Sequence, residues 1–175
     1  MTALARPAAG EYDPASNGYV ALTPALDDPI RQLTAQRDRV HDVYARLSRD
    51  RAGYRYAPDK WTVREVLGHV CDAERILSYR LLRVARGDAT PLPGFDESTY
   101  VPAAAFDRRS MADVIDEWLA VRGATIALVH GMPDEAWTRR GVANNVAVTA
   151  RCILYVLVGH VEHHLKMLDV RYGVQ

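Results

Sequence analysis

Signals for the start of helices constrain this 175-residue chain more than any other feature of its sequence. N-cap signatures occur at Asp28-Pro29, at Thr62–Glu65 and at Ser110–Asp113. Apolar residues recur after each signature at helical spacing, and no segment alternates with a period of two. The sequence therefore predicts an all-α protein whose helices cover about residues 28–47, 62–87, 110–130 and 146–172.

Two of the predicted connections are too long for tight helical hairpins. Residues 88–109 contain three prolines and a glycine, and residues 134–145 also lack a helical pattern. Such lengths favour a four-helix bundle with long connections over a simple up-down-up-down bundle. Residues 1–26 contain three further prolines and are predicted to form an irregular N-terminal segment, which precedes a single domain at residues 27–175.

Composition and charge exclude several partners and compartments. The 22 basic residues balance the 22 acidic ones, whereas a nucleic-acid-binding protein usually carries a basic excess. The longest apolar run, Cys152–Val158, is far shorter than the ~20 residues of a membrane helix, and the N-terminus has no apolar signal-peptide core. Two cysteines cannot build a disulfide framework. We therefore expect a cytoplasmic protein that binds neither nucleic acid nor membrane.

Three histidines fall inside the apolar stripes of two predicted helices. His160 and His164 are four residues apart in the last helix, so a helix stacks them on one face. His69 lies in the apolar stripe of the second helix, and bundled helices face each other through such stripes. His163 points about 100° away from His164 and is left out. His69, His160 and His164 are therefore expected to meet across the core.

Two interpretations of this histidine trio remain open on spacing alone. Buried histidines are often hydrogen-bonded core residues without a ligand. A pair four residues apart can also place two imidazole nitrogens on one divalent metal ion, and a third histidine from a facing helix would complete the set. Imidazole suits zinc, nickel, iron and copper alike, so the residue types do not select the metal.

Three segments together resemble the DinB/YfiT-like superfamily. They are Lys60–Ala89, with the sequence KWTVREVLGHVCDAERILSYRLLRVARGDA, Thr90–Val101, with TPLPGFDESTYV, and Val156–Leu168, with VLVGHVEHHLKML. The resemblance covers about residues 28–172. It implies a four-helix bundle of down-up-up-down type, often a homodimer. It also implies nickel or zinc held by three histidines, which by motif are His69, His160 and His164, with water at the remaining positions.

An open site of three neutral histidines is typical of catalytic rather than structural zinc. The first functional hypothesis is a metal-dependent hydrolase of a small-molecule substrate, which uses water bound to the metal. The resemblance also allows a transferase or isomerase that depends on a low-molecular-weight thiol of the bacillithiol or mycothiol type. A non-enzymatic metal-binding stress protein is the third hypothesis, so enzymatic activity stays open at this point.

Further residues are candidates for the surroundings of the metal. Glu65 and Asp72 lie one turn from His69 on either side, and either could be a general base or accept a hydrogen bond from a metal-binding histidine. Arg80 could hold an anionic cosubstrate, while Phe95 and Tyr100 belong to the long connection at 88–109, which could form a wall over the metal. A packed structural loop or a dimer contact is the alternative for that connection.

Overall fold

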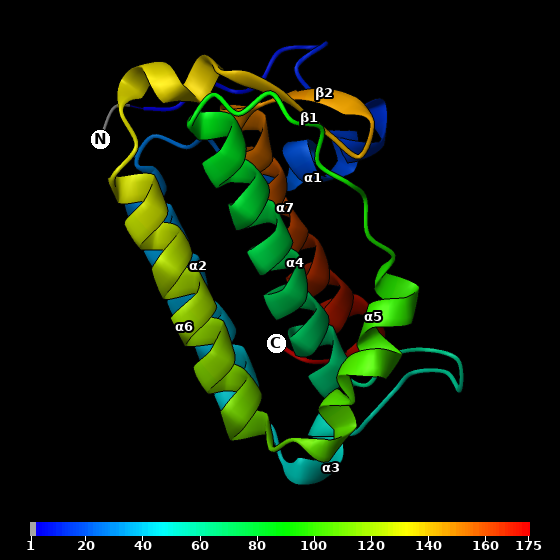
Figure 1. Cartoon of the computed structure of the whole chain (residues 1–175). Coiled ribbons are helices and arrows are strands. Elements are labelled where there is room, and N and C mark those ends of the chain that lie inside the picture. Colours follow the sequence, from blue (N-terminus) through cyan, green and yellow to red (C-terminus); the bar gives the residue numbers. More distant parts are fainter. Residues whose placement is uncertain (1–2) are drawn as a thin grey trace.

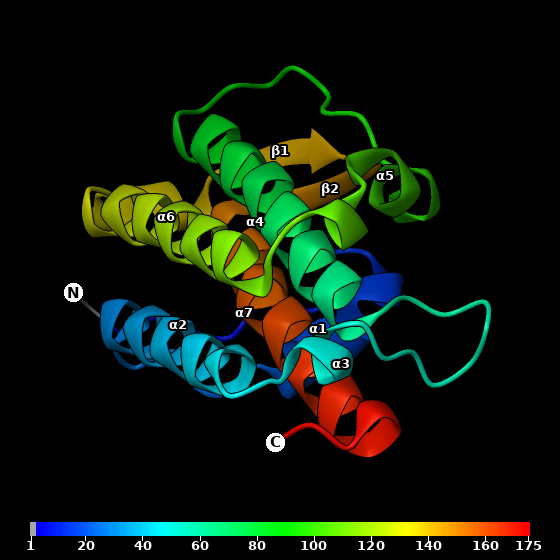
Figure 2. The ribbon, with the colours of Figure 1, turned by 90° about the horizontal axis from the view of Figure 1, so that it is seen from below.

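The computed structural model describes residues 3–175, and four long helices form its body (Figure 1). Their bounds are Pro29–Ala45 (α2), Val63–Ala85 (α4), Met111–His130 (α6) and Ala150–Met167 (α7). A π-helical turn, η4 (Leu168–Tyr172), extends α7. Helices α2 and α7 run down in Figure 1, whereas α4 and α6 run up, so the predicted down-up-up-down bundle is confirmed. Seen from below, α6 packs between α2 and α4, and α4 packs on α7 (Figure 2).

Local capping explains where these helices begin. The Asp28 side chain accepts a hydrogen bond from the Arg31 amide, ahead of Pro29 in the first turn of α2. Complete capping boxes start α4, through Thr62 and Glu65, and α6, through Ser110 and Asp113. The three predicted N-termini are therefore confirmed. At the other end of α4, Gly87 has a φ of 77°, as the left-handed C′ position requires.

The connection between α4 and α6 returns along the whole bundle, because these two neighbours are parallel and cannot be joined by a tight turn. It contains a short helix, α5 (Glu97–Ala104), and a 3-10 turn, η2 (Phe106–Arg108), which the sequence analysis treated as irregular. The Asp96 side chain caps α5 by accepting a hydrogen bond from the Ser98 amide at 2.9 Å. Two further short helices are α3 (Arg49–Ala52) and η3 (Asp134–Thr138).

A short β-hairpin, which the sequence analysis did not predict, interrupts the otherwise helical chain. Strands β1 (Arg140–Ala143) and β2 (Val146–Thr149) pair antiparallel around the two-residue loop Asn144-Asn145. Both asparagines have positive φ, 53° and 63°, as a tight hairpin turn requires. Four-residue strands are too short to show a period of two. Consequently α7 begins at Ala150 with Thr149 as its N-cap, at the C-terminal limit of the predicted start at Val146–Thr149.

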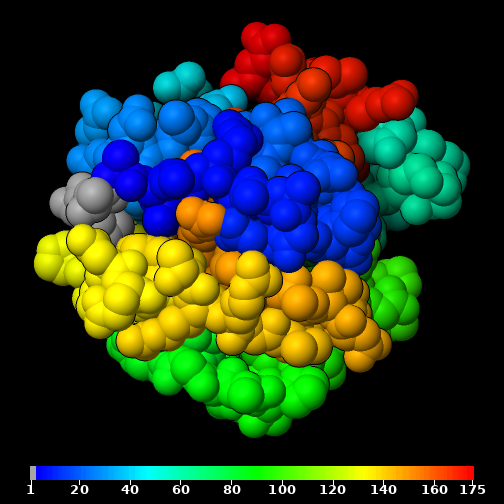
Figure 3. Space-filling view, turned by 90° about the horizontal axis from the view of Figure 1, so that it is seen from above, coloured from blue at the N-terminus to red at the C-terminus, as the bar shows by residue number. Residues whose placement is uncertain are grey.

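The N-terminal segment is more ordered than predicted. Within residues 3–26 it forms a 3-10 turn, η1 (Pro14–Ser16), and a helix, α1 (Asn17–Leu22), that packs on α7. Leu4, Val20 and Leu26 join the buried core. The Glu11 carboxylate accepts hydrogen bonds from Thr149 and Arg151, and Figure 3 shows these N-terminal residues (blue) lying against the hairpin region (orange). The expectation of an irregular segment was wrong because these contacts join residues far apart in sequence.

A buried polar layer divides the core into two apolar clusters. At its centre the Arg122 side chain is fully buried and lies against Glu74, which is 2% exposed. Arg122 also donates to the side-chain oxygen of Gln36, whose amide donates to Glu162 and to the Val158 carbonyl. The layer thus joins α2, α4, α6 and α7 just above the histidines of α7. Of the helices that the structure describes, none is long and apolar enough to cross a membrane.

Candidate metal centre

His69, His160 and His164 meet at one point in the core, as predicted. The His160 Nε2 lies 3.0 Å from the His69 Nε2 and 3.2 Å from the His164 Nε2. The three rings are inclined to one another by 62°, 67° and 68°, so they surround a common centre instead of stacking. No other group of three or more potential metal ligands occurs within residues 3–175.

These distances fit a metal ion better than a purely hydrogen-bonded cluster. Two nitrogens that each lie about 2.0–2.1 Å from one ion are about 2.8–3.4 Å apart for bond angles between 90° and tetrahedral. A neutral imidazole has one N–H and one lone pair, so the His160 Nε2 cannot form full hydrogen bonds to both neighbours at once. A cation would engage the lone pairs of all three nitrogens. The residues present therefore fit a divalent metal ion.

Burial keeps the three imidazoles in the form that binds metal. They are 5%, 8% and 6% exposed in the order His69, His160 and His164. Loss of hydration lowers the pKa of His69 to about 4 and that of His160 to about 3, and it lowers the pKa of His164 as well. All three rings are thus neutral near pH 7, and no proton has to leave before a metal binds.

The absence of a side chain at Gly159 allows α1 to pack closely against α7 beside the three histidines. A Cβ at Gly159 would collide with the backbone carbonyl of Tyr19 on α1. The close approach is held by Thr23, whose hydroxyl donates to the Tyr155 carbonyl on α7 at 2.6 Å. It places the Tyr19 ring edge-on to His160, with 5.5 Å between ring centroids. An N-terminal helix thereby becomes part of the wall of the site.

Replacement of Gly159 by alanine is expected to destabilise the protein by about 1–3 kcal/mol or more, because the backbone of α1 must move. Gly123, inside α6, is the matched control, since a Cβ there meets nothing within 4 Å. Gly123→Ala should stabilise the protein by about 0.5–1 kcal/mol through helix propensity. Urea unfolding of both variants measures the difference. Equal stabilities of the two variants would contradict the close approach of α1 and α7.

An opening of about 360 Å³ leads from the surface to the histidines. His69 and His164 lie at its base, and aromatic rings form much of its wall. The Trp61 ring is tilted by 38° against His69 with 4.8 Å between centroids. The Glu97 carboxylate, on the first turn of α5, also lines the opening and has no hydrogen-bond or ion-pair partner among the described residues. An open position beside the histidines is what a catalytic metal site needs.

Sequence reasoning missed Tyr19, Trp61 and Glu97 as residues of this opening. Tyr19 gave no signal, because its place depends on contacts between α1 and α7. Glu97 could have been found by reading Asp96 as the N-cap of a helix inside the long connection. His163, which the helical phase left out, is exposed at the rim and packs edge-on against Tyr19.

The two carboxylates predicted near the metal are engaged elsewhere. Glu65 accepts a hydrogen bond from the Thr62 amide at 2.6 Å in the capping box of α4. Asp72 lies 3.6 Å from Arg75, and burial raises the pKa of its carboxyl. Neither lines the opening at the histidines. The structure therefore does not bring these two side chains to the predicted place.

The predicted substrate contacts form a cluster of their own, and none of them lines the opening at the histidines. The Arg80 guanidinium donates to the Pro93 carbonyl at 2.7 Å and lies 5.8 Å from the centre of the Phe95 ring. Phe95 in turn contacts Tyr100, with 5.5 Å between centroids. Arg80 also lines a separate small cavity between α4, α7 and the hairpin. The three residues are together, and their role in substrate binding stays a prediction.

Sequence comparison identifies one protein family. The sequence model of the DinB superfamily matches residues 32–168, which include all four long helices from the first turn of α2 onwards. Among proteins with curated descriptions, none matches the chain.

Structure comparison adds two solved proteins of similar fold. One is YfiT from Bacillus subtilis, described as "a probable metal-dependent hydrolase with an unusual four-helix bundle topology". It superposes with a TM-score of 0.74 and 18% identity, over 85% of this chain and 88% of YfiT. The other is a mycothiol-dependent maleylpyruvate isomerase, with a TM-score of 0.65 and 12% identity. That match covers 86% of this chain, which spans 62% of the isomerase. At these identities the likeness concerns the fold.

Proposed function

The chain belongs to the DinB superfamily, and from this premise we propose that it is a metal-dependent hydrolase of a small-molecule substrate. The observation that carries the proposal is the convergence of three neutral histidine nitrogens, two of which belong to His69 and His164 at the base of an opening. His69, His160 and His164 would hold one divalent ion, nickel or zinc. The description of YfiT as a hydrolase supports the same reaction class.

A bound divalent ion would supply a Lewis acid that polarises a carbonyl and makes water acidic near neutral pH. The aromatic side chains of the opening, including Trp61 and Tyr19, offer flat apolar surfaces that would orient a substrate and exclude bulk water. Lys60 and Asp59 at the rim pair with each other at 2.7 Å. Glu97 is therefore the one acidic group of the opening whose carboxylate is available to a substrate or a water molecule.

We assign proton transfer to Glu97, in place of Glu65 and Asp72. Its carboxylate acts electrostatically on His69, where it partly opposes the fall in pKa caused by burial. In hydrolysis one carboxylate oxygen would accept a proton from the attacking water as the new C–O bond forms. The same proton would then pass to the leaving group as its bond to carbon breaks, so that Glu97 ends unprotonated.

Glu97→Gln is expected to lower kcat/KM by about 100-fold or more, since general acid–base catalysis contributes that much. The metal content should not change, because Glu97 is outside the histidine trio. Asp59→Asn is the matched control from the same opening and should stay within a few-fold of wild type. Full activity of the Glu97→Gln protein would remove Glu97 from the mechanism while leaving the metal site in place.

A thiol-dependent transferase or isomerase is the second candidate function. It is favoured by the shared fold with the mycothiol-dependent isomerase and by Arg80, which is half-buried on α4, the helix that also carries His69. Arg80 could pair with a carboxylate of an anionic thiol cosubstrate. A non-enzymatic metal-binding role is the third candidate.

Two activity panels on fully metallated protein separate these candidates. A hydrolase turns over generic esters or amides without any cosubstrate, and we expect this result. A thiol transferase stays inactive until a low-molecular-weight thiol is supplied together with an electrophile such as monochlorobimane. Activity must disappear in the His164→Ala protein in either case. Metallated protein that is inactive in both panels would contradict an enzymatic role and favour metal binding alone.

A further inference from the structure

A second cavity, of about 500 Å³, lies at the end of the bundle where α3 is found, at the bottom of Figure 1. Its walls come from α3, the first turn of α4, η2 and the start of α6. None of its residues lines the opening at the histidines. Its volume falls within the range of pockets that bind small molecules.

Four arginines and a single acidic residue line this cavity. They are Arg49 of α3, Arg64 of α4, and Arg108 and Arg109 after α5, with Asp107 as the acid. This excess of positive charge is local, because the whole chain carries equal numbers of basic and acidic residues. A concave surface of one sign concentrates ligands of the opposite sign.

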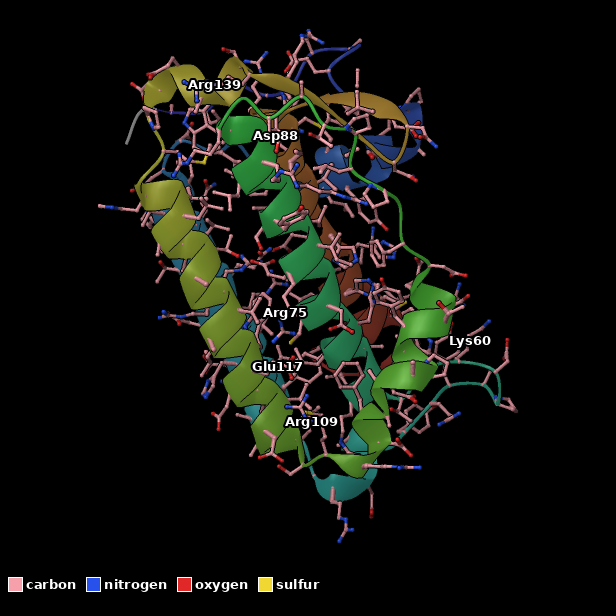
Figure 4. The ribbon with its side chains drawn as sticks, in the orientation of Figure 1. Lys60, Arg75, Asp88, Arg109, Glu117 and Arg139 are labelled. Atoms are coloured by element: carbon pink, nitrogen blue, oxygen red, sulfur yellow. The ribbon has the colours of Figure 1, made fainter. Side chains whose placement is uncertain are left out.

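Only one of the four arginines is neutralised by an acidic side chain. Arg109 forms an ion pair with Glu117, which Arg75 contacts from the other side (Figure 4). Arg49, Arg64 and Arg108 have no carboxylate oxygen within 4 Å among the residues that the structure describes. Arg64 instead donates to the main-chain carbonyl of Asp107 at 3.0 Å. Three guanidinium groups from three separate elements are thus left with positive charge around one cavity.

The remaining lining residues limit the kind of ligand that the cavity can take. Ser110 and Met111, at the N-terminus of the 20-residue helix α6, belong to the same wall. The dipole of a helix of this length favours negative charge at that end, where the Asp113 carboxylate of the capping box already lies. Leu47, Ala52 and Met111 supply an apolar part of the lining. Guanidinium groups bind planar or tetrahedral oxyanions through paired hydrogen bonds.

We propose that this cavity is a second binding site, which takes a small molecule carrying a phosphate or polyphosphate group. Arg64 and Arg108 hold the oxyanion, and the apolar lining contacts the rest of the molecule. The site is independent of the metal centre, because its residues and its opening are separate. The proposal therefore stands or falls without the hydrolase activity.

Calorimetric titration with inorganic pyrophosphate tests the site, with the full-length chain in about 150 mM salt to suppress weak surface binding. We expect saturable binding of one pyrophosphate per chain. Arg64→Gln and Arg108→Gln should each weaken it by about tenfold or more, since a charge-assisted hydrogen bond contributes about 1.5–3 kcal/mol. Arg86→Gln is the matched control at the opposite end of α4, because Arg86, like Arg108, is exposed and has no acidic partner among the residues that the structure describes.

Two further arms identify the ligand and the place of binding. In one arm citrate, a polycarboxylate, replaces pyrophosphate. If the protein binds citrate and pyrophosphate with equal affinity, the proposal that the ligand carries a phosphate group is overturned. The His164→Ala protein replaces the wild type in the other arm, and it should bind pyrophosphate unchanged. Loss of binding in that variant would move the anion to the metal centre. The proposal is also overturned if the wild type shows no saturable binding, or if Arg86→Gln weakens binding as much as Arg108→Gln does.

Discussion

Replacing His164 by alanine is expected to remove stoichiometric metal binding and to lower the affinity for nickel or zinc by more than about 100-fold. Loss of a residue that is only hydrogen-bonded to a metal ligand typically lowers the metal affinity by about 10–100-fold. His164 is itself one of the three proposed ligands, so its loss should lower the affinity further. Its Nε2 lies 3.2 Å from the His160 Nε2, and no other described residue joins this group of potential ligands. Elemental analysis of protein purified with excess metal, followed by competition titration, measures the change.

His163→Ala is the control that makes this result specific. His163 is the next residue before His164, but its side chain is exposed and lies outside the trio. The His163 variant should therefore bind metal like the wild type. A wild-type protein without metal under metal-replete conditions, or a His164 variant that keeps its metal, would contradict the proposed centre.

Metal binding should also appear as thermal stability. A ligand that binds only the folded state stabilises it by about 2.7 kcal/mol at a free concentration 100 times its Kd. Added metal should therefore raise the Tm of the wild type and of His163→Ala, and leave that of His164→Ala unchanged. A chelator should reverse the shift. This readout does not depend on any enzymatic reaction.

Breaking the buried ion pair is expected to have the largest effect on stability. Glu74→Ala should destabilise the protein by about 3–5 kcal/mol, because it leaves a buried guanidinium without its counter-charge. The Arg122 Nε lies 2.8 Å from one carboxylate oxygen of Glu74, and its Nη2 donates to the other at 2.9 Å. The Trp118 ring, whose centre lies 4.6 Å from the guanidinium carbon of Arg122, carries no negative charge that could replace the Glu74 carboxylate. Urea unfolding measures the loss.

A double variant separates the cost of an unpaired charge from the value of the pair itself. Glu74→Leu combined with Arg122→Met removes both charges and retains most of the volume, so its stability should be much closer to wild type. Asp38→Ala, which breaks the solvent-exposed pair with Arg37, should cost less than about 1 kcal/mol. Additive effects of the two single substitutions at 74 and 122 would argue against this pairing.

The same polar layer connects the bundle to the metal centre. The Gln36 amide, held by Arg122, donates to the Val158 carbonyl two residues before His160 and to the Glu162 carboxylate two residues after it. These contacts fix the turn of α7 that carries the histidines. The four long helices therefore keep the ligand geometry together, although only α4 and α7 carry ligands.

Much of the fold and the whole histidine trio could be predicted because they depend on short-range periodicity. A capping box involves residues three positions apart, and a helical stripe repeats every three to four residues, so both are visible in the chain itself. His69, His160 and His164 were selected because each falls in such a stripe, and bundled helices bury their stripes against one another. Helical phase also excluded His163, which the structure places at the surface.

The remainder of the site could not be predicted because it depends on contacts between distant residues. Which carboxylate lines the opening at the histidines was decided by tertiary packing, which engages Glu65 and Asp72 elsewhere and brings Glu97 there from α5. The collision that any side chain at position 159 would cause involves Tyr19, 140 residues earlier, and no local pattern reports it. The sequence by itself determined the helices and the ligands, since these follow from local periodicity. Only the tertiary structure decided what surrounds the metal, because burial and pairing are settled when all the helices pack at once.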